Sequence, residues 1–267
     1  MQNLDNLESQ SIYIFREARY AFKNLAMLWS MGKDSNVLLW LAKKAFCGHI
    51  PFPIVHIDTT YEFPQMLEFR SWAKEFYGFE LIVKINHEAI ARGISYKTHD
   101  PLTVTHELKT VALKQALETY KWDGLITGIR RDEDGVRAKE RYFSPRNQSM
   151  EWEYKNQPPE FWNLFLATLP NNGHMRIQPL LDWTELDIWL YIKRENIPIP
   201  SLYFSKNGKR YRSLGCWPIT HPVDSHASTI DEIIEELYTT KTSERAGRAQ
   251  DHAEPNAMQK LRAKGFL

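Results

Sequence analysis

The sequence predicts an α/β fold: a parallel, twisted sheet with helices on both faces, followed by a C-terminal extension. Short apolar runs alternate with segments whose apolar residues recur at helical spacing. Strands alternating with helices of this length are typical of right-handed βαβ units and a mostly parallel sheet. We expect the α/β domain to cover residues 1–200 and the extension to cover residues 201–267, packing on the core or on a partner.

The expected elements follow from local patterns in chain order. Thr184 and Thr229 each begin a capping-box spacing, which predicts a helix start. The expected strands are residues 27–29, 53–58, 79–85, 123–129 and 176–180. The expected helices are residues 7–22, 37–45, 64–77, 106–120, 184–192 and 229–238.

Length and composition favour a globular protein that works in the cytoplasm. The 267 residues are 43% hydrophobic and 25% charged, which suffices to build a core. The net charge of +1 argues against a general binder of nucleic acid or of membrane surfaces. Two cysteines, Cys47 and Cys216, support neither a disulfide framework nor a four-cysteine zinc site. Residues 1–25 hold no apolar signal segment, and no run approaches the roughly 18 residues of a membrane helix.

The turn after the first strand carries the strongest functional signal. It reads Ser30-Met31-Gly32-Lys33-Asp34-Ser35. A strand, a glycine turn and a helix start together aim free backbone N–H groups at an anion. Gly32 allows close approach, Lys33 adds positive charge, and the hydroxyls of Ser30 and Ser35 can donate to phosphate oxygens. An ordinary turn with a solvated lysine is the alternative.

Two more candidate groups follow the ends of later strands. Asp58 ends an apolar run, and ligands of open α/β sheets bind outside the carboxyl ends of strands. A cap or turn aspartate is the alternative. Residues 128–146 contain six basic residues, suited to a polyanion that gains charge as a leaving group departs. The basic residues are Arg130, Arg131, Arg137, Lys139, Arg141 and Arg146. Neutralisation by the four acidic residues of the same segment is the alternative.

The loop at residues 30–35 resembles the S-x-G-x-D-S loop, or PP-loop, of ATP pyrophosphatases, which split ATP between the α- and β-phosphates. It does not match the Walker A pattern, because Met27 and Asp34 stand where that pattern has a glycine and a Ser or Thr. Further segments make the whole chain resemble the small, ATP-binding subunit of bacterial sulfate adenylyltransferases, within the superfamily that includes phosphoadenylyl-sulfate reductases. These segments are residues 30–35, 51–59, 130–141, 179–192, 212–220 and 242–251.

This resemblance implies an adenine nucleotide α-hydrolase-like fold and the formation of adenylyl sulfate and pyrophosphate from ATP and sulfate. The candidate catalytic residues are Lys33, Arg130, Arg131 and Arg137, and which arginine meets which anion stays open. The candidate nucleotide-binding residues are Ser30, Gly32, Lys33, Asp34, Ser35 and Asp58. Asp34 or Asp58 would hold Mg²⁺ through oxygen ligands and water. The implied partner is the large GTPase subunit, in a heterodimer, because the sequence holds no second NTPase loop; no nucleic acid or membrane is implied.

Two departures from the family and three rival functions accompany this interpretation. Residues 203–214 are shorter than in the family's usual member, and Met31 occupies a variable loop position. A reductase of the same fold needs a nucleophilic cysteine on a mobile tail, but residues 260–267 contain none and Cys216 lies in an apolar context. Near-neutral charge and the lack of paired cysteines oppose a tRNA thiolase. The third rival is a non-catalytic nucleotide-binding regulatory subunit.

Overall fold

The computed structural model describes residues 2–152, 157, 159–165, 167–169, 173–249, 258–259 and 265. Within these residues, six strands form one sheet in the order β3-β2-β1-β4-β6-β5, and two more form a separate pair, β7 and β8. The strands are β1 Leu25–Leu28, β2 Ile54–Ile57, β3 Leu81–Lys84, β4 Gly124–Ile126, β5 Phe143–Arg146, β6 His174–Ile177, β7 Lys209–Arg210 and β8 Val223–Asp224.

A helix overlaps each predicted segment, and two short helices, His87–Ala91 and Pro101–Thr105, were not predicted. The α-helices are α1 Gln2–Ala21, α2 Lys33–Ala45, α3 Pro64–Tyr77, α4 His87–Ala91, α5 Pro101–Thr105, α6 Ala112–Tyr120, α7 Glu185–Glu195 and α8 Ile230–Thr239. Short 3₁₀ turns occupy Gly135–Arg137, Phe161–Asn163, Ser201–Tyr203 and Trp217–Ile219. The helix expected over residues 106–120 instead begins with a π-helical turn, His106–Val111, which connects α5 to α6. Such π-helical turns are rare and often occur at functional sites.

The sheet is mostly parallel, as the sequence predicts. β1 pairs in parallel with β2 and β4, and β6 continues the parallel set beside β4. Only β5 among the paired strands of this sheet runs antiparallel, at the edge beside β6. The sequence patterns did not indicate β5, because its Phe-Ser-Pro-Arg segment contains Pro145 and lacks an apolar alternation. A proline is tolerated at an edge strand, where one backbone N–H needs no partner.

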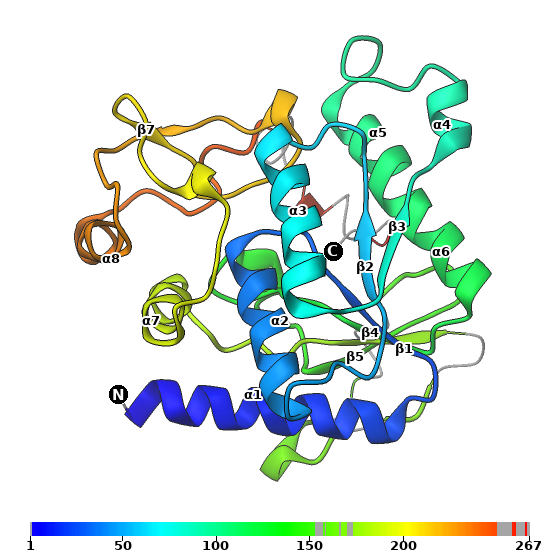
Figure 1. Ribbon diagram of the computed structural model, residues 1–267. Helices are drawn as coiled ribbons and strands as arrows, with labels where there is room; N and C mark the ends of the chain where they lie inside the picture. The colour runs from blue at the N-terminus through cyan, green and yellow to red at the C-terminus, as the bar shows by residue number, and fades with distance from the viewer. Residues whose placement is uncertain are drawn as a thin grey trace.

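Helices cover both faces of the sheet, which confirms the predicted fold class. Successive strand residues point to opposite faces. Met27 and Ile126 belong to the larger core, which includes residues of α1, α2 and α7. Ala26 and Leu125 belong to a smaller core with Leu113 of α6. Figure 1 shows α2 and α3 on one side of the strands and α6 on the other.

The order of strands changes direction between β1 and β4. β2 and β3 follow β1 toward one edge, whereas β4, β6 and β5 lie toward the other. Ligands of open α/β sheets bind at this kind of switch point, outside the carboxyl ends of the strands. The loops that follow β1 and β4 meet there: a Cβ on Gly128 would lie 3.6 Å from the backbone of Asp34 and of Ser35.

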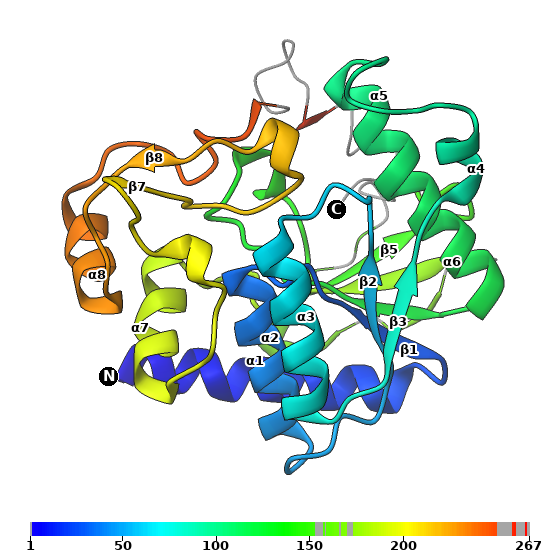
Figure 2. The ribbon, with the colours of Figure 1, turned by 45° about the horizontal axis from the view of Figure 1, so that its top comes forward.

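Part of the segment 201–249 reaches this end of the sheet, where the Tyr203 hydroxyl accepts the backbone N–H of Lys33. α8 lies beside α7 in both ribbon views (Figures 1 and 2), and Figure 2 shows β7 and β8 above α8. The chain then returns and pairs the backbone N–H of His221 with the carbonyl of Gly247 at 2.9 Å. The division at residue 200 stays a prediction. In the described part of the chain, no helix is long and apolar enough to span a bilayer.

Candidate nucleotide site

Side-chain hydrogen bonds and burial stabilise the backbone of the loop between β1 and the first turn of α2. Met31 adopts a left-handed backbone conformation (φ 62°), which is uncommon for a residue other than glycine. Its carbonyl accepts a 2.9 Å hydrogen bond from Asn36 Nδ2, and Asn36 Oδ1 accepts one from Trp29 Nε1 at 2.9 Å. Met31 and Trp29 are both buried. The backbone energy cost is therefore offset by packing and by these bonds, as expected for a functional turn.

The start of α2 lies against a side chain from the C-terminal part of the chain. The backbone N–H of Lys33 donates to the Tyr203 hydroxyl at 2.8 Å. Ser35 Oγ donates to the Gly32 carbonyl at 2.9 Å and lies 3.3 Å from Ser30 Oγ. Burial raises the pKa of Tyr203 to about 12, so the phenol stays protonated at neutral pH. A helix N-terminus with polar groups gathered at its first turn is a suitable anion site.

A buried network of charges joins three distant segments at this point. Lys33 Nζ lies 3.3 Å from an Asp34 oxygen and also pairs with Glu244. Arg130, from the loop after β4, bonds Asp34 Oδ1 through Nε at 2.5 Å, reaches Asp132 at 3.2 Å and pairs with Glu244 as well. Lys33 and Arg130 are 1% and 0% exposed, so their pairs with the buried Glu244 are shielded from water, whereas Asp132 is exposed.

Electrostatics keep Lys33, Arg130 and Glu244 ionised, because each shift of pKa favours the charged form. Burial alone would lower the pKa of Lys33, but the carboxylates of Asp34 and Glu244 outweigh it and hold that pKa above its ordinary value. Burial alone would raise the pKa of Glu244, but Arg130 and Lys33 bring it down to about 2. Removing one partner from such a network would leave a buried charge less well compensated.

The segment that carries Glu244 is packed tightly over the loop. A Cβ on Gly247 would lie 2.4 Å from the His221 carbonyl oxygen, and a Cβ on Gly215 would lie 1.5 Å from Arg248 Nη1. Arg248 also donates from Nε to Ser213 Oγ at 3.1 Å. These contacts tie residues 243–248 to other loops of the same chain.

A pocket opens beside the network at the switch point of the sheet. Its lining includes apolar side chains, among them Leu28, Val55, Met66 and Leu113. It also includes residues of the PP-loop, Lys109 of the π-helical turn and three arginines. These are Arg137, Arg245 and Arg248. Apolar groups suit a base and cationic groups suit phosphates, so the lining offers both kinds of contact that a nucleotide needs.

The structure brings most of the sequence-predicted site residues together. Ser30, Gly32, Lys33, Asp34, Ser35 and Arg137 line the pocket. Arg130 lies behind the lining and holds Asp34 in place. Arg131 points elsewhere: its guanidinium pairs with Asp182 and donates to the Glu140 carbonyl at 2.9 Å.

Asp58 is also not among the residues that line the pocket. Its carboxylate accepts from Arg70 at 2.7 Å and from the Thr60 N–H at 2.8 Å. It neighbours His56 and Glu62, which do line the pocket.

Several site residues escaped the sequence patterns. Tyr203 and Glu244 reach the loop from 170 and 211 positions along the chain, so no local pattern could have placed them there. Lys109 lies in a π-helical turn inside a segment that reads as ordinary helix. The arginine-rich stretch at residues 243–248 was a usable signal for Arg245 and Arg248.

Comparisons with known proteins agree with this geometry. Residues 24–222 match the model of the phosphoadenosine phosphosulfate reductase domain. The chain is 42% identical to "Sulfate adenylyltransferase subunit 2" of Brucella abortus, over 100% of this chain and 99% of the relative. It is also 42% identical to the protein of the same name from Colwellia psychrerythraea, with the same coverage.

Solved structures share the fold at lower identity. A phosphoadenylyl-sulfate reductase from Candida auris superposes with a TM-score of 0.54 at 16% identity, covering 86% of this chain and 97% of that one. An FMN adenylyltransferase from Candida glabrata gives a TM-score of 0.61 at 18% identity, covering 92% and 88%. At such identities the likeness shows the fold alone. The full-length identity and the matching domain model together show that the chain belongs to the sulfate adenylyltransferase subunit 2 family, whose members are nucleotidyltransferase subunits built on the phosphoadenosine phosphosulfate reductase domain.

Proposed function

We propose that this chain transfers the adenylyl group of ATP to sulfate, forming adenylyl sulfate and pyrophosphate. One observation carries the proposal: Lys33, Asp34 and Arg130 form a buried network at the first turn of α2, beside a pocket at the switch point of the sheet. The family to which the chain belongs carries the name of this activity. The site therefore supplies the positive groups that phosphoryl-type chemistry needs at a helix N-terminus.

The phosphates of ATP would replace two side-chain groups that contact Lys33 in this structure. Tyr203 accepts the Lys33 N–H, and Glu244 pairs with the Lys33 ammonium. The β- and γ-phosphates would instead accept hydrogen bonds from the backbone N–H and the ammonium of Lys33. The hydroxyls of Ser30 and Ser35 would be further donors. The adenosine would pack on apolar side chains of the pocket lining, such as Val55.

The reaction itself needs positioning and charge stabilisation rather than a base. A sulfate oxygen attacks the α-phosphorus, the new phosphorus–oxygen bond forms, and the bond from the α-phosphorus to the bridging oxygen breaks. The electron pair leaves with pyrophosphate. Sulfate is already deprotonated at neutral pH, so no proton is moved. Lys33 and Arg137 would stabilise the charge that develops on the departing pyrophosphate, and Arg245 and Arg248 are candidates for holding sulfate.

Asp34 is a suitable residue to hold Mg²⁺. Its side chain is 19% exposed and lines the pocket, and Lys33 and Arg130 use only part of the roughly four lone-pair positions of its carboxylate. When bound, Mg²⁺ would neutralise charge on the phosphate oxygens. Asp58, the other sequence candidate, pairs with Arg70 and is not among the residues that line the pocket.

We also propose that the chain works in the cytoplasm as one subunit of a heterodimer. The relatives are named as subunit 2 of an enzyme, which implies another subunit. A GTP-hydrolysing large subunit would supply the energy, because the phosphoric–sulfuric anhydride stores more hydrolysis free energy than the bond cleaved in ATP. The sequence contains one phosphate loop and no Walker A pattern.

Cysteine placement disfavours the reductase alternative. Cys216 is 3% exposed, and its sulfur lies 3.3 Å from Thr59 Oγ1. Within the described residues, neither Cys216 nor Cys47 lines the pocket. The expectation that residues 260–267 form a tail without a nucleophile falls outside the described residues except at Gly265.

Exchange of labelled pyrophosphate into ATP tests the proposal. The purified chain with its partner should catalyse exchange only when sulfate is present, because the reverse reaction requires adenylyl sulfate. A non-catalytic regulatory subunit would bind ATP without exchange. Exchange that does not depend on sulfate would point to another adenylyl acceptor.

A further inference from the structure

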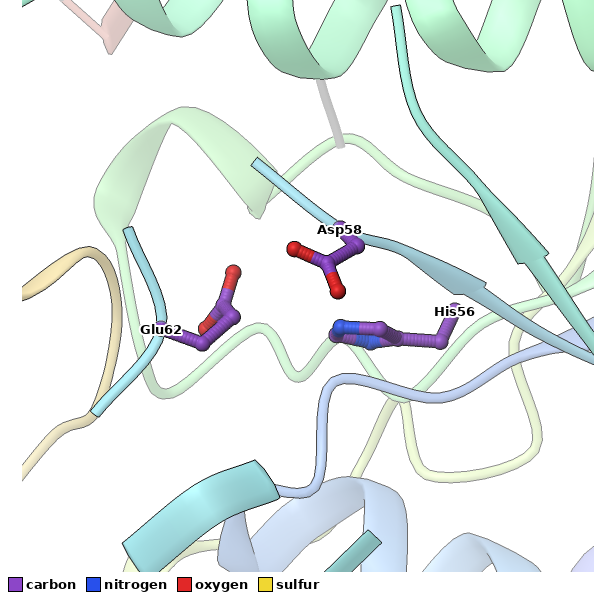
Figure 3. A group of neighbouring side chains, drawn as sticks. All are labelled: His56, Asp58 and Glu62. Atoms are coloured by element: carbon purple, nitrogen blue, oxygen red, sulfur yellow. The ribbon is translucent and has the colours of Figure 1, made fainter. Parts of the chain in front are cut away.

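A second group of chemically active side chains lies at the carboxyl end of β2, separate from the PP-loop. One nitrogen of His56 and one carboxylate oxygen each from Asp58 and Glu62 lie within 4.8 Å of one another. Figure 3 shows the imidazole of His56 and the two carboxylates converging on one space. His56 and Glu62 also line the pocket that the proposed nucleotide would occupy.

The hydrogen bonding of His56 leaves one ring nitrogen with an available lone pair. Nδ1 lies 3.1 Å from the Trp29 carbonyl oxygen. A carbonyl can only accept, so Nδ1 carries the proton and Nε2 does not. Nε2 is buried and has no hydrogen-bond partner within the part of the chain that the structure describes, and the residue is 2% exposed. Buried polar atoms are nearly always paired, and an unpaired one points to a missing ligand.

This arrangement is the one found around metal-binding histidines. Such a histidine donates its other ring N–H to a carbonyl or carboxylate, which fixes the ring and directs the free nitrogen at the ion. The Trp29 carbonyl plays that part for His56. β2 fixes the backbone of His56, because it pairs with β1 on one side and β3 on the other.

The two carboxylates are oriented but not saturated by their hydrogen bonds. Asp58 accepts from the Thr60 N–H through Oδ1 and from Arg70 through Oδ2 at 2.7 Å. Glu62 Oε1 accepts from Thr59 Oγ1 at 3.1 Å. A carboxylate has about four lone-pair positions, so each residue keeps oxygen sites for a cation. Two carboxylates against the single guanidinium of Arg70 leave one net negative charge.

We propose that His56, Asp58 and Glu62 bind a divalent transition-metal ion. The donor set combines one imidazole nitrogen with two carboxylates, and imidazole favours Mn²⁺ or Zn²⁺ over Mg²⁺, which prefers oxygen and water. The site is distinct from Asp34 and its proposed Mg²⁺. It would place a fixed cation in the wall of the pocket, beside the space for the nucleotide.

Binding of Mn²⁺ to the full chain without nucleotide tests this inference. Electron paramagnetic resonance should show one saturable site with nitrogen coupling from an imidazole. His56→Ala should abolish the nitrogen coupling and weaken binding by about 10-fold or more. Glu62→Gln, which preserves side-chain shape, should weaken binding similarly while its thermal melting matches the wild type. Zn²⁺ should displace the Mn²⁺, and equimolar Mg²⁺ should not.

Asp34→Asn serves as the matched control, because it removes a carboxylate from the PP-loop and leaves the cluster unchanged. Mn²⁺ affinity and nitrogen coupling should persist in this variant. The inference is overturned if the wild type shows no saturable site, if His56→Ala and Glu62→Gln bind Mn²⁺ normally, or if Asp34→Asn alone abolishes binding. None of these readouts uses ATP or sulfate, so they are independent of adenylyl transfer.

Discussion

Replacing Lys33 with alanine should reduce adenylyl transfer sharply while leaving the fold intact. The change removes the ammonium that lies 3.3 Å from Asp34 and pairs with Glu244. Arg130 still bonds both of these carboxylates, so neither is left without a cation. The loss of unfolding free energy should therefore be about 3 kcal/mol or less, the lower end for a broken buried pair.

The effect on the reaction should be larger than the effect on the fold. Lys33 is buried in the lining of the pocket, where a preorganised charge is worth far more than in water. Deleting one such contact costs about 10²-fold in rate, or roughly 2.7 kcal/mol. Lys44→Ala is the control: Lys44 is on the same helix, pairs with Glu8 at 2.8 Å, and is 32% exposed.

Sulfate-dependent exchange of pyrophosphate into ATP measures this difference, with thermal melting recorded on the same samples. We expect Lys33→Ala to lose about 10²-fold and Lys44→Ala to stay within about twofold of the wild type. A folded Lys33→Ala variant with wild-type exchange would refute the role assigned to the loop.

Glu244→Gln should tighten ATP binding by about 10-fold, or about 1.4 kcal/mol, as measured by calorimetry. The change removes a carboxylate that competes with the phosphates for Lys33 and Arg130. Unchanged or weaker binding would contradict the proposal that the phosphates of ATP replace Glu244. Cys216→Ser should keep most exchange activity, with any loss matching lower thermal stability; lost turnover in a stable variant would revive the reductase interpretation. Burial and the charges of Arg176 and Arg146 lower the pKa of His174 to about 3 in the folded state. Between about pH 6.5 and pH 3 only the unfolded state therefore takes up this proton, so the free energy of unfolding decreases as the pH drops through this range. His174→Asn should reduce that acid slope by up to about 1.4 kcal/mol per pH unit in denaturant titrations, and an unchanged slope would contradict the assignment. When pyrophosphatase is omitted, net formation of adenylyl sulfate should require the partner subunit and GTP. An equal yield of adenylyl sulfate without them would contradict the proposed coupling to GTP hydrolysis.

Local patterns predicted the parts of the fold that depend on neighbouring residues. The apolar strands, the helix starts at Thr184 and Thr229 and the PP-loop are all encoded within a few positions, and both threonines form the predicted capping boxes. β5 was missed because Pro145 and Arg146 do not resemble a strand. Its pairing partner, β6, lies about 30 positions further along the chain.

The predicted site residues that the structure brings together mostly follow strands closely. Arg130 and Arg131 are adjacent, yet Arg130 joins the network at Asp34 and Arg131 pairs with Asp182. Nothing in the sequence distinguishes two neighbouring arginines in this way, because the difference comes from backbone direction. Tyr203 and Glu244 complete the site through long-range packing, which a local pattern does not encode.

Conversion of radiolabelled sulfate tests the central claim most directly. The purified chain, with the partner subunit, ATP, GTP and Mg²⁺, should transfer the label into adenylyl sulfate, and each product should accompany one pyrophosphate. Lys33→Ala in the same assay should lose about 10²-fold of this yield. Absence of labelled adenylyl sulfate from folded, ATP-binding protein, or release of sulfite from added adenylyl sulfate, would contradict the account.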